Sequence, residues 1–232
     1  GLMSGTSVDG VDASIIKSDG NREYSPLLDR YFEYGDKIRQ GILNLRAKIL
    51  VSNHLIEHES EIKDIEREIT LFHANAVKEI LNITKVDIDL LGFHGQTIFH
   101  DSKKKITKQL GDGKLLSQLI KKKVVYDFRQ NDLKNGGQGA PLTPIFHNLI
   151  ANKYLKKELD RTYSVNFINI GGISNLTKTV KWDKLDKKIE FIEACDIGPG
   201  NCLIDDWVRK NSKKRYDIDG SLASIGKTDR LI

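Results

Sequence analysis

The sequence lacks any apolar run that approaches the ~20 residues needed to span a bilayer as a helix. No basic-then-apolar signal segment stands at its start. It has only two cysteines, Cys195 and Cys202, and they do not have the C-x-x-C spacing. We therefore expect reduced, partly buried cysteines rather than a disulfide or a metal pair. Together these absences predict a cytoplasmic protein with no membrane partner.

Charged residues make up 30% of the chain and hydrophobic residues 39%, which is typical of a soluble globular protein. At 232 residues it is long enough for one large domain or two small ones. The net charge of +5 comes largely from short lysine runs at residues 103–105, 121–123, 156–157 and 213–215. Nucleic-acid surfaces interleave basic residues with aromatics or glycines. These runs therefore indicate solvated faces and predict no nucleic-acid partner.

The first twelve residues read GLMSGTSVDGVD, in which a small, hydroxylated segment separates two apolar runs. Asp-Gly between such runs is a strong hairpin signal. The predicted tip offers backbone amides, hydroxyls and the carboxylate of Asp9. Amides and hydroxyls suit phosphate oxygens, and a carboxylate suits hydrated magnesium on the same phosphates. Taken alone, an ordinary glycine-rich turn explains S-G-T-S better, and the Gly-Lys-Ser/Thr ending of a Walker loop is missing.

A second predicted hairpin favours the interpretation that the first hairpin binds phosphate. Residues 167–177 read FINIGGISNLT, so an apolar strand again meets a Gly-Gly tip and continues as a strand. Two such hairpins separated by most of the chain suggest one nucleotide held between two lobes.

Apolar residues recur at three- and four-residue steps in residues 59–81, which predicts a long helix after a shorter one at 38–50. The histidines of this region, His54, His58 and His73, do not have a metal-binding spacing, so we expect surface or boundary positions. A strand is also expected around residues 30–34.

Residues 86–93 read as a strand, and a strand after a helix suggests a parallel sheet with crossover helices. Ligands collect at the carboxyl ends of such strands, which places His94, Gln96 and Thr97 at the predicted site. His94 is as suited to bonding a neighbouring loop as to touching substrate.

We then expect a short helix at residues 114–121 and a strand at 124–128. The strand ends around Asp127, and Arg129 and a glycine-rich loop follow it. Chemistry is often placed at such a strand end, although, taken alone, an Asp–Arg ion pair closing the strand explains the pattern better. Residues 141–159 are expected to be helical and to connect to a second lobe. A strand at 189–194 then leads into a loop at 196–201 and a helix at 202–210. Helix amino termini favour anions, so this loop is a candidate phosphate or sugar site.

Five segments together resemble the anhydro-N-acetylmuramic acid kinase family, in order and over essentially the whole chain. They are SGTSVDGVD, GFHGQT, DFRQNDLKNGGQGAPL, INIGGISNLT and DIGPGNCLIDDW. The resemblance implies the two-lobed α/β fold of the actin, hexokinase and heat-shock-70 ATPases, also called ASKHA and ribonuclease H-like. It implies a first lobe at residues 1–145 and the start of a second at 146–232, incomplete because family members continue well past Ile232.

The resemblance also implies a reaction. Water opens the 1,6-anhydro bond of anhydro-N-acetylmuramic acid while O6 takes the γ-phosphoryl group of ATP, with Mg²⁺, giving N-acetylmuramic acid 6-phosphate and ADP in cell-wall recycling. Asp127 would be the general base and Asp9 the magnesium ligand. The implied ATP-binding residues are Gly5, Thr6, Ser7, Val8, Asp9, Gly10, Val11, Asp12, Gly171, Gly172 and Asn175. The implied substrate-binding residues are His94, Gln96, Thr97, Arg129, Asp196, Gly198 and Asn201.

Two further hypotheses stay open beside this one. The chain could be a non-catalytic fragment or remnant that binds sugar or nucleotide, or a kinase of the same fold for another sugar. Arg129 is suited either to orienting Asp127 or to binding the lactyl carboxylate of the sugar. A homodimer is implied by the family alone.

Overall fold

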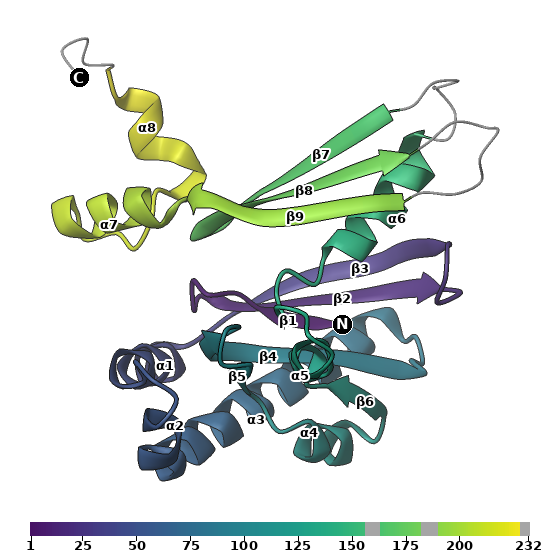
Figure 1. Ribbon diagram of the computed structural model, residues 1–232. Helices are drawn as coiled ribbons and strands as arrows, with labels where there is room; N and C mark the ends of the chain where they lie inside the picture. The colour runs from purple at the N-terminus through teal and green to yellow at the C-terminus, as the bar shows by residue number, and fades with distance from the viewer. Residues whose placement is uncertain (156–162, 182–189, 228–232) are drawn as a thin grey trace. The chain divides into compact units, whose positions relative to one another are not determined.

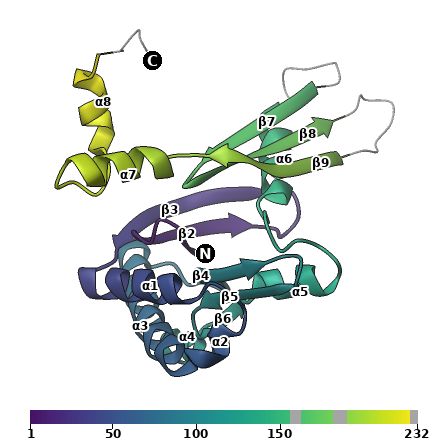
Figure 2. The same cartoon turned by 60° about the vertical axis from the view of Figure 1, so that its left-hand side comes forward.

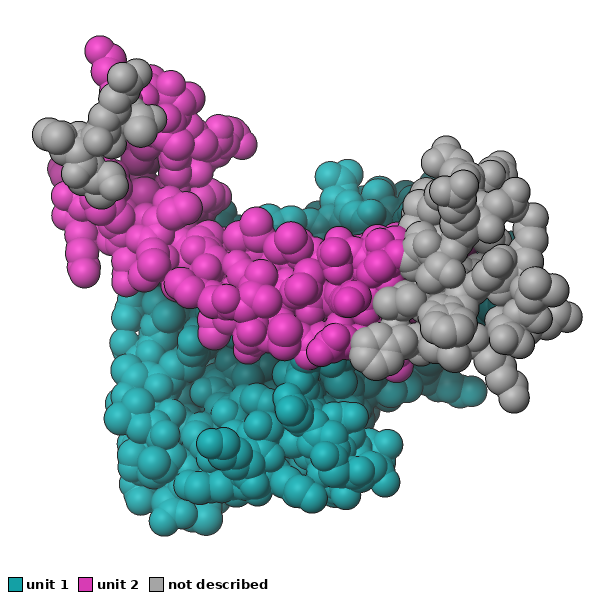
Figure 3. Space-filling model, turned by 45° about the horizontal axis from the view of Figure 1, so that its top comes forward, with its two compact units in different colours: residues 1–142 teal, residues 143–232 magenta. Residues whose placement is uncertain are grey.

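The computed structural model describes residues 1–155, 163–181 and 190–227. The chain forms two compact units, Gly1–Leu142 and Thr143–Ile232, coloured separately in Figure 3. Both contain helices and strands, so the α/β class is confirmed. Whether these units correspond to the two predicted lobes stays a prediction.

Unit 1 is built on a mixed sheet with the strand order β3-β2-β1-β4-β5, in which β6 also pairs with β4. Parallel pairing joins β1 to β4 and β4 to β6, whereas the β1–β2, β2–β3 and β4–β5 pairs are antiparallel. The expected parallel sheet is therefore wrong in part, because three antiparallel pairs of consecutive strands add β2, β3 and β5. The strands are β1 (Leu2–Ser4), β2 (Gly10–Ser18), β3 (Tyr24–Glu33), β4 (Leu90–Asp101), β5 (Ile106–Leu110) and β6 (Lys123–Tyr126).

Helices α1 (Asp36–Lys48), α3 (Glu59–Thr84) and α4 (Gly113–Ile120) cover one face of this sheet (Figures 1 and 2). The long helix α3 buries the apolar stripe that predicted it, including Ile62, Ile69 and Ile80. The side chain of Asp112 caps α4 by accepting hydrogen bonds from the amides of Lys114 and Leu115, each at 2.9 Å. Two short helices were not predicted, α2 (His54–Glu57) and α5 (Phe128–Lys134).

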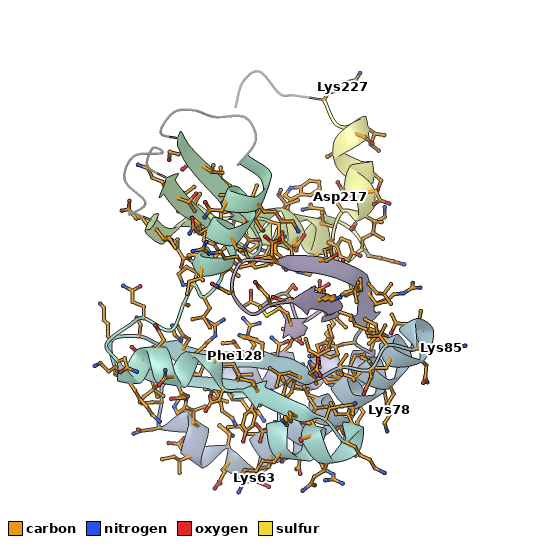
Figure 4. The ribbon with its side chains drawn as sticks, turned by 90° about the vertical axis from the view of Figure 1, so that its right-hand side faces the viewer. Lys63, Lys78, Lys85, Phe128, Asp217 and Lys227 are labelled. Carbon is orange, nitrogen blue, oxygen red and sulfur yellow. The ribbon has the colours of Figure 1, made fainter. Side chains whose placement is uncertain are left out.

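The core lies between these helices and the sheet. It includes Leu2, Val11 and Ala13 from the first hairpin and Ile42, Leu45 and Ile69 from the helices. The prediction for His73 was wrong, because this α3 residue is fully buried within the core. Lys63 and Lys78 of the same helix are exposed (Figure 4).

Strand β4 contains a bulge at Gly95 and ends later than the sequence predicted. The strand was predicted to stop at Phe93, but it continues to Asp101. Gly95 has φ +73°, and the register between β1 and β4 shifts there, so that Ser4 lies opposite Gln96. Because a bulge inserts one residue into the alternation, Phe93 and Gln96 both point into the core. His94, Gln96 and Thr97 therefore lie inside the strand rather than beyond it.

We expect Gly95→Ala to destabilise unit 1 strongly, by several kcal/mol. A Cβ atom at this position would lie 2.2 Å from the carbonyl oxygen of Leu110, and its backbone conformation is one that alanine rarely adopts. Thermal unfolding of the variant measures the loss. Gly20→Ala is the matched control, since Gly20 has the same φ of +73° with nothing within 4 Å of the added Cβ. Equal losses in both variants would show that the contact with Leu110 does not matter.

Unit 2 has a three-stranded antiparallel sheet with the order β7-β8-β9. One helix, α6 (Pro144–Leu155), packs against it: the ring of His147 stacks on Phe167 with centroids 4.7 Å apart and bonds Thr177 Oγ1 at 2.9 Å. The other elements are β7 (Tyr163–Ile170), β8 (Ile173–Lys181), β9 (Glu190–Pro199), α7 (Cys202–Asn211), a 3₁₀ turn at Ile218–Gly220 and α8 (Ser221–Ile225). The second hairpin and the helix at α7 are confirmed.

Strand β9 extends to Pro199, so the predicted loop at 196–201 is mostly strand. Lys156 and Lys157, one of the predicted lysine runs, lie outside the described residues. Both cysteines are free, as predicted, but Cys195 is exposed rather than partly buried. The lysines at 103–105 and 213–214 are exposed, in agreement with solvated faces.

Candidate functional site

The loop between β1 and β2, residues 5–9, is tied to the protein through its carbonyl groups. Gly5 O accepts a hydrogen bond from Gln96 Nε2 at 2.9 Å and one from the amide of Val8 at 3.3 Å. Thr6 O accepts from Arg46 of α1 at 2.7 Å, and Asp9 O accepts from the amide of Tyr34 at 2.8 Å. Residues of β4, of α1 and of the segment between β3 and α1 thus hold the loop.

Val8 anchors the middle of the loop. Its side chain is completely buried in the core, and its φ of +57° is rare for a β-branched residue. Such a conformation persists only where surrounding contacts enforce it. Here the buried side chain and the bonds to Gly5 and Asp9 on either side supply that enforcement.

The other face of the loop presents donors and a carboxylate. Thr6, Ser7 and Asp9 are exposed, and no acceptor in the described ranges takes the amides of these three residues. Ser7 Oγ donates to Asp9 Oδ1 at 2.6 Å, which fixes that carboxylate. Outward amides beside a hydroxyl form the type of concavity that binds phosphate oxygens.

Asp12 of β2 stands near Asp9 on the exposed side of the sheet. Burial, and then the negative charge of Asp9, raise the pKa of the Asp12 carboxyl above its usual value. Two carboxylates that repel each other are stabilised by a cation between or beside them.

Among the described residues, no three His, Cys, Asp or Glu side chains gather as a metal-binding group. Magnesium does not need such a group, since it keeps several waters and binds through one or two carboxylates together with substrate phosphates. The Asp9 carboxylate, which accepts a hydrogen bond from Ser7 and has the Asp12 carboxylate nearby, fits these requirements of magnesium.

Asp127 lies at the carboxyl end of β6, directly beside His94 of β4. The two strands are parallel with Phe93 opposite Tyr126, so the next residue of each is also adjacent. Asp127 has φ +63° and turns the chain into α5, whose first residue, Phe128, is labelled in Figure 4. Its carboxylate is exposed and makes no hydrogen bond with any described residue.

A hollow of about 210 Å³ opens at this strand end. Asp127 and His94 both line it, so the structure brings these two predicted residues together. Its other lining residues are Phe93, Thr107, Lys108, Gln109, Gly111, Tyr126 and Gln130.

Arg129 of α5 does not pair with Asp127. Its Nε and Nη2 donate to His94 Nε2 at 3.1 and 2.9 Å, and its Nη1 donates to Gly139 O at 2.5 Å. A guanidinium has five N–H groups, so two remain available. The predicted Asp–Arg ion pair is wrong, and Arg129 is positioned by the histidine instead.

The bonds of His94 define its tautomer. Its Nδ1 lies 2.7 Å from Gly95 O, which can only accept, so Nδ1 carries the proton and Nε2 accepts from Arg129. Burial, and then the nearby Arg129 cation, lower the pKa of His94. Neutral His94 thus holds Arg129 in place. This corresponds to the first of the two roles considered for His94, bonding a neighbouring segment rather than touching substrate.

Gln96 and Thr97 take different positions. Gln96 is completely buried beneath the 5–9 loop, so its predicted role in substrate binding, which stays a prediction, would act through that loop. Thr97 Oγ1 accepts from Gln109 of β5 at 3.2 Å and is partly exposed. The two residues are consecutive in β4, so their side chains point to opposite faces of the sheet.

In unit 2 the tip of the second hairpin joins the start of α7. Gly171 O accepts from the amide of Asn201 at 2.8 Å, and Gly172 O accepts from the amide of Gly200 at 3.0 Å. Gly200 must be glycine, since a Cβ there would lie 2.0 Å from Gly171 O. Asn175 lies opposite Asp196 and Ser174 opposite Gly198. The predicted residues of unit 2 therefore gather at one end of its sheet.

A family model described as anhydro-N-acetylmuramic acid kinase matches residues 1–232. The chain belongs to this family. Its members among curated proteins include an anhydro-N-acetylmuramic acid kinase of Pelagibacter ubique (strain HTCC1062), 52% identical over 232 residues that cover 100% of this chain and 59% of the relative. Proteins of the same name from Rhizobium etli and Rhodopseudomonas palustris (strain BisB18) are 40% and 38% identical. They are matched over 98% and 99% of this chain and 59% and 60% of their own lengths.

The chain thus spans about three-fifths of the length of the kinases that it matches. Membership of the anhydro-N-acetylmuramic acid kinase family is the resemblance that the sequence motifs indicated. None of the described helices is both long and apolar enough to cross a membrane.

Sequence reasoning missed the residues that support the 5–9 loop in this kinase-family chain, namely Ser4, Tyr34, Arg46 and His73. A signal existed for His73, which follows Ile69 by four residues and precedes Ala76 by three, on the apolar stripe of α3. Arg46 and Tyr34 gave no comparable signal, because only the folded chain brings them to the loop.

Proposed function

We propose that the chain acts in an ATP-dependent kinase that opens the 1,6-anhydro bond of anhydro-N-acetylmuramic acid and phosphorylates O6. The products are N-acetylmuramic acid 6-phosphate and ADP, and the role is in cell-wall recycling in the cytoplasm. The observation that carries the proposal is the 5–9 loop, whose carbonyls bond inward while its amides and Asp9 face outward. Family membership supports the same activity.

In this proposal the loop that includes Gly5, Thr6, Ser7 and Val8 binds the phosphates of ATP, through the outward amides and the hydroxyls of Thr6 and Ser7, and Gly10, Val11 and Asp12 continue the site. Asp9 would hold Mg²⁺. When bound, the ion would neutralise charge on the transferred phosphoryl group. Ser7 keeps the Asp9 carboxylate in position throughout.

Asp127 is the proposed general base. Its exposed carboxylate would take a proton from the water that attacks the anomeric carbon, and O6 would leave that carbon and accept the phosphoryl group. Water is a poor nucleophile at an acetal carbon, so a positioned base matters. Asp127 borders the hollow and has no internal partner among the described residues, and both features suit this role.

Arg129, held by His94 and Gly139, has N–H groups left for an anionic substituent. We propose that it binds the lactyl carboxylate of the sugar, with Thr97 nearby. In unit 2, we propose that Gly171, Gly172 and Asn175 contact the phosphates and that Asp196, Gly198 and Asn201 contact the substrate.

The two units would then be lobes of the ASKHA fold, the second incomplete in this chain. The mixed order β3-β2-β1-β4 with helices on one face is compatible with such a lobe. A homodimer is part of the family-based proposal.

Release of ADP that depends on both ATP and the anhydro-sugar tests the function. It is measured for this chain and for a version extended to the length of the relatives. Binding of both ligands by the extended version without turnover would favour a non-catalytic remnant. Turnover of ordinary hexoses but not of the anhydro-sugar would favour a kinase for another sugar.

Asp9→Asn is expected to weaken ATP binding about tenfold in the presence of magnesium and little in its absence. The amide keeps the size of the side chain but loses the charge that attracts the cation. Calorimetric titration with and without magnesium measures the difference. Equal weakening under both conditions would contradict the magnesium role. Asp29→Asn, an exposed carboxylate on β3, is the control.

A further inference from the structure

Four polar residues lie buried beneath the 5–9 loop in a core that is otherwise largely apolar. Ser4, Tyr34, His73 and Gln96 are each at most 2% exposed. Ser4 and Gln96 are opposite one another on the parallel strands β1 and β4. Ser4 is the last residue before the loop, so the group sits directly under its first peptide.

A hydrogen-bond chain with a fixed direction links three of them. His73 Nδ1 lies 2.8 Å from Ile69 O, an acceptor, so Nδ1 carries the proton and Nε2 accepts. Ser4 Oγ therefore donates to His73 Nε2 at 3.1 Å. Tyr34 must then donate its hydroxyl to Ser4 Oγ at 2.9 Å. The backbone amide of Tyr34 also bonds Asp9 O, so the chain reaches both ends of the loop.

Gln96 is the fourth residue of the group, and its burial lowers the stability of the folded protein. Its Nε2 donates to Gly5 O, but its Oε1 is buried without a hydrogen-bond partner among the described residues. A buried acceptor without a donor destabilises a folded protein. An apolar residue of the same size would avoid that cost, so stability alone does not explain a glutamine here.

We propose that Ser4, Tyr34, His73 and Gln96 are positioning residues that hold the 5–9 loop in its phosphate-binding form, with Gln96 opposing fold stability. The proposal rests on the function proposed above, because it assigns these residues to the same loop. They act on the ligand only through the loop, since none of them reaches the surface.

Gln96→Met separates positioning from stability, because methionine fills the same volume without the orphan oxygen. We expect an unchanged or higher unfolding temperature, together with about tenfold weaker Mg·ATP binding by the chain. We also expect faster hydrogen exchange, without nucleotide, at the two amides that bond loop carbonyls, Val8 to Gly5 O and Tyr34 to Asp9 O. Ser4→Ala is expected to speed the same exchange while lowering the unfolding temperature, since it leaves His73 Nε2 without a donor.

Thr70→Val is the matched control. Thr70 is also a fully buried polar residue of α3, but its hydroxyl bonds Glu66 O and the amide of Asp112 rather than the loop. It should lower the unfolding temperature and leave loop exchange unchanged.

The outcomes separate the two proposals. If the unmodified chain does not bind Mg·ATP, the proposed function fails for this chain, while exchange at the loop amides still decides the positioning role. Unchanged exchange in both Gln96→Met and Ser4→Ala would overturn the positioning role. A Gln96→Met chain that unfolds earlier, or fails to fold, would overturn the claim that Gln96 opposes stability.

Discussion

Replacing Asp127 with asparagine is expected to lower sugar-dependent ADP release by ~10²–10⁴-fold, the usual contribution of a positioned base. The affinity for Mg·ATP should stay nearly the same, because Asp127 borders the hollow at the end of β6 and the proposed phosphate loop, residues 5–9, belongs to the β1–β2 hairpin. The unfolding temperature should also be unchanged, since the carboxylate is exposed and makes no hydrogen bond with a described residue.

Steady-state kinetics and calorimetry on the extended version of the chain measure these quantities. Asp89→Asn is a suitable control, because Asp89 is an exposed carboxylate just before β4, with the same chemical change. A large loss of ATP affinity in Asp127→Asn would show that Asp127 is structural. Full activity of the variant would remove it from the reaction altogether.

Unit 1 is expected to lose stability as the pH falls from about 6.5 towards 4, and His73 is the main reason. Burial, reinforced by the nearby His94, lowers the pKa of His73 from 6.5 to about 4, although its bond to Ile69 O opposes the shift. Between these values the unfolded chain binds a proton that the folded chain does not. The stabilisation is therefore complete above pH 6.5 and is lost as the pH falls, by about 3 kcal/mol in total.

Hydrogen exchange of core amides in β1 and α3, followed as a function of pH, measures this loss. Tryptophan fluorescence does not report on unit 1, because both tryptophans, Trp182 and Trp207, belong to unit 2. His73→Gln should flatten the pH dependence, since glutamine does not titrate. His58→Gln, at a partly exposed position, should leave it unchanged. A slope that persists in His73→Gln would assign the effect to other groups, among which His94 and His100 also have lowered pKa values.

Local patterns predicted the elements of this protein well. The helix at 59–81 follows from apolar spacing, and both hairpins follow from glycine-containing tips between apolar runs. These signals are local because backbone hydrogen bonds within a helix or across a tight turn join residues that are close in sequence. The strand ends were predicted less well, since β4 and β9 continue beyond the glycines that were read as their ends. A glycine in a bulge and a glycine in a turn look alike in a sequence.

By itself the sequence determined the α/β class, the two hairpins and the family, because motifs and periodicity are properties of neighbouring residues. Only the tertiary structure decided which groups support the 5–9 loop and what Arg129 contacts. His73 meets Ser4 across 69 residues, and Arg129 meets His94 across 35. Such pairs form when a helix packs on a sheet in one register, and the bulge at Gly95 sets that register for Gln96. The burial that makes His73 a neutral acceptor likewise exists only once the core has formed.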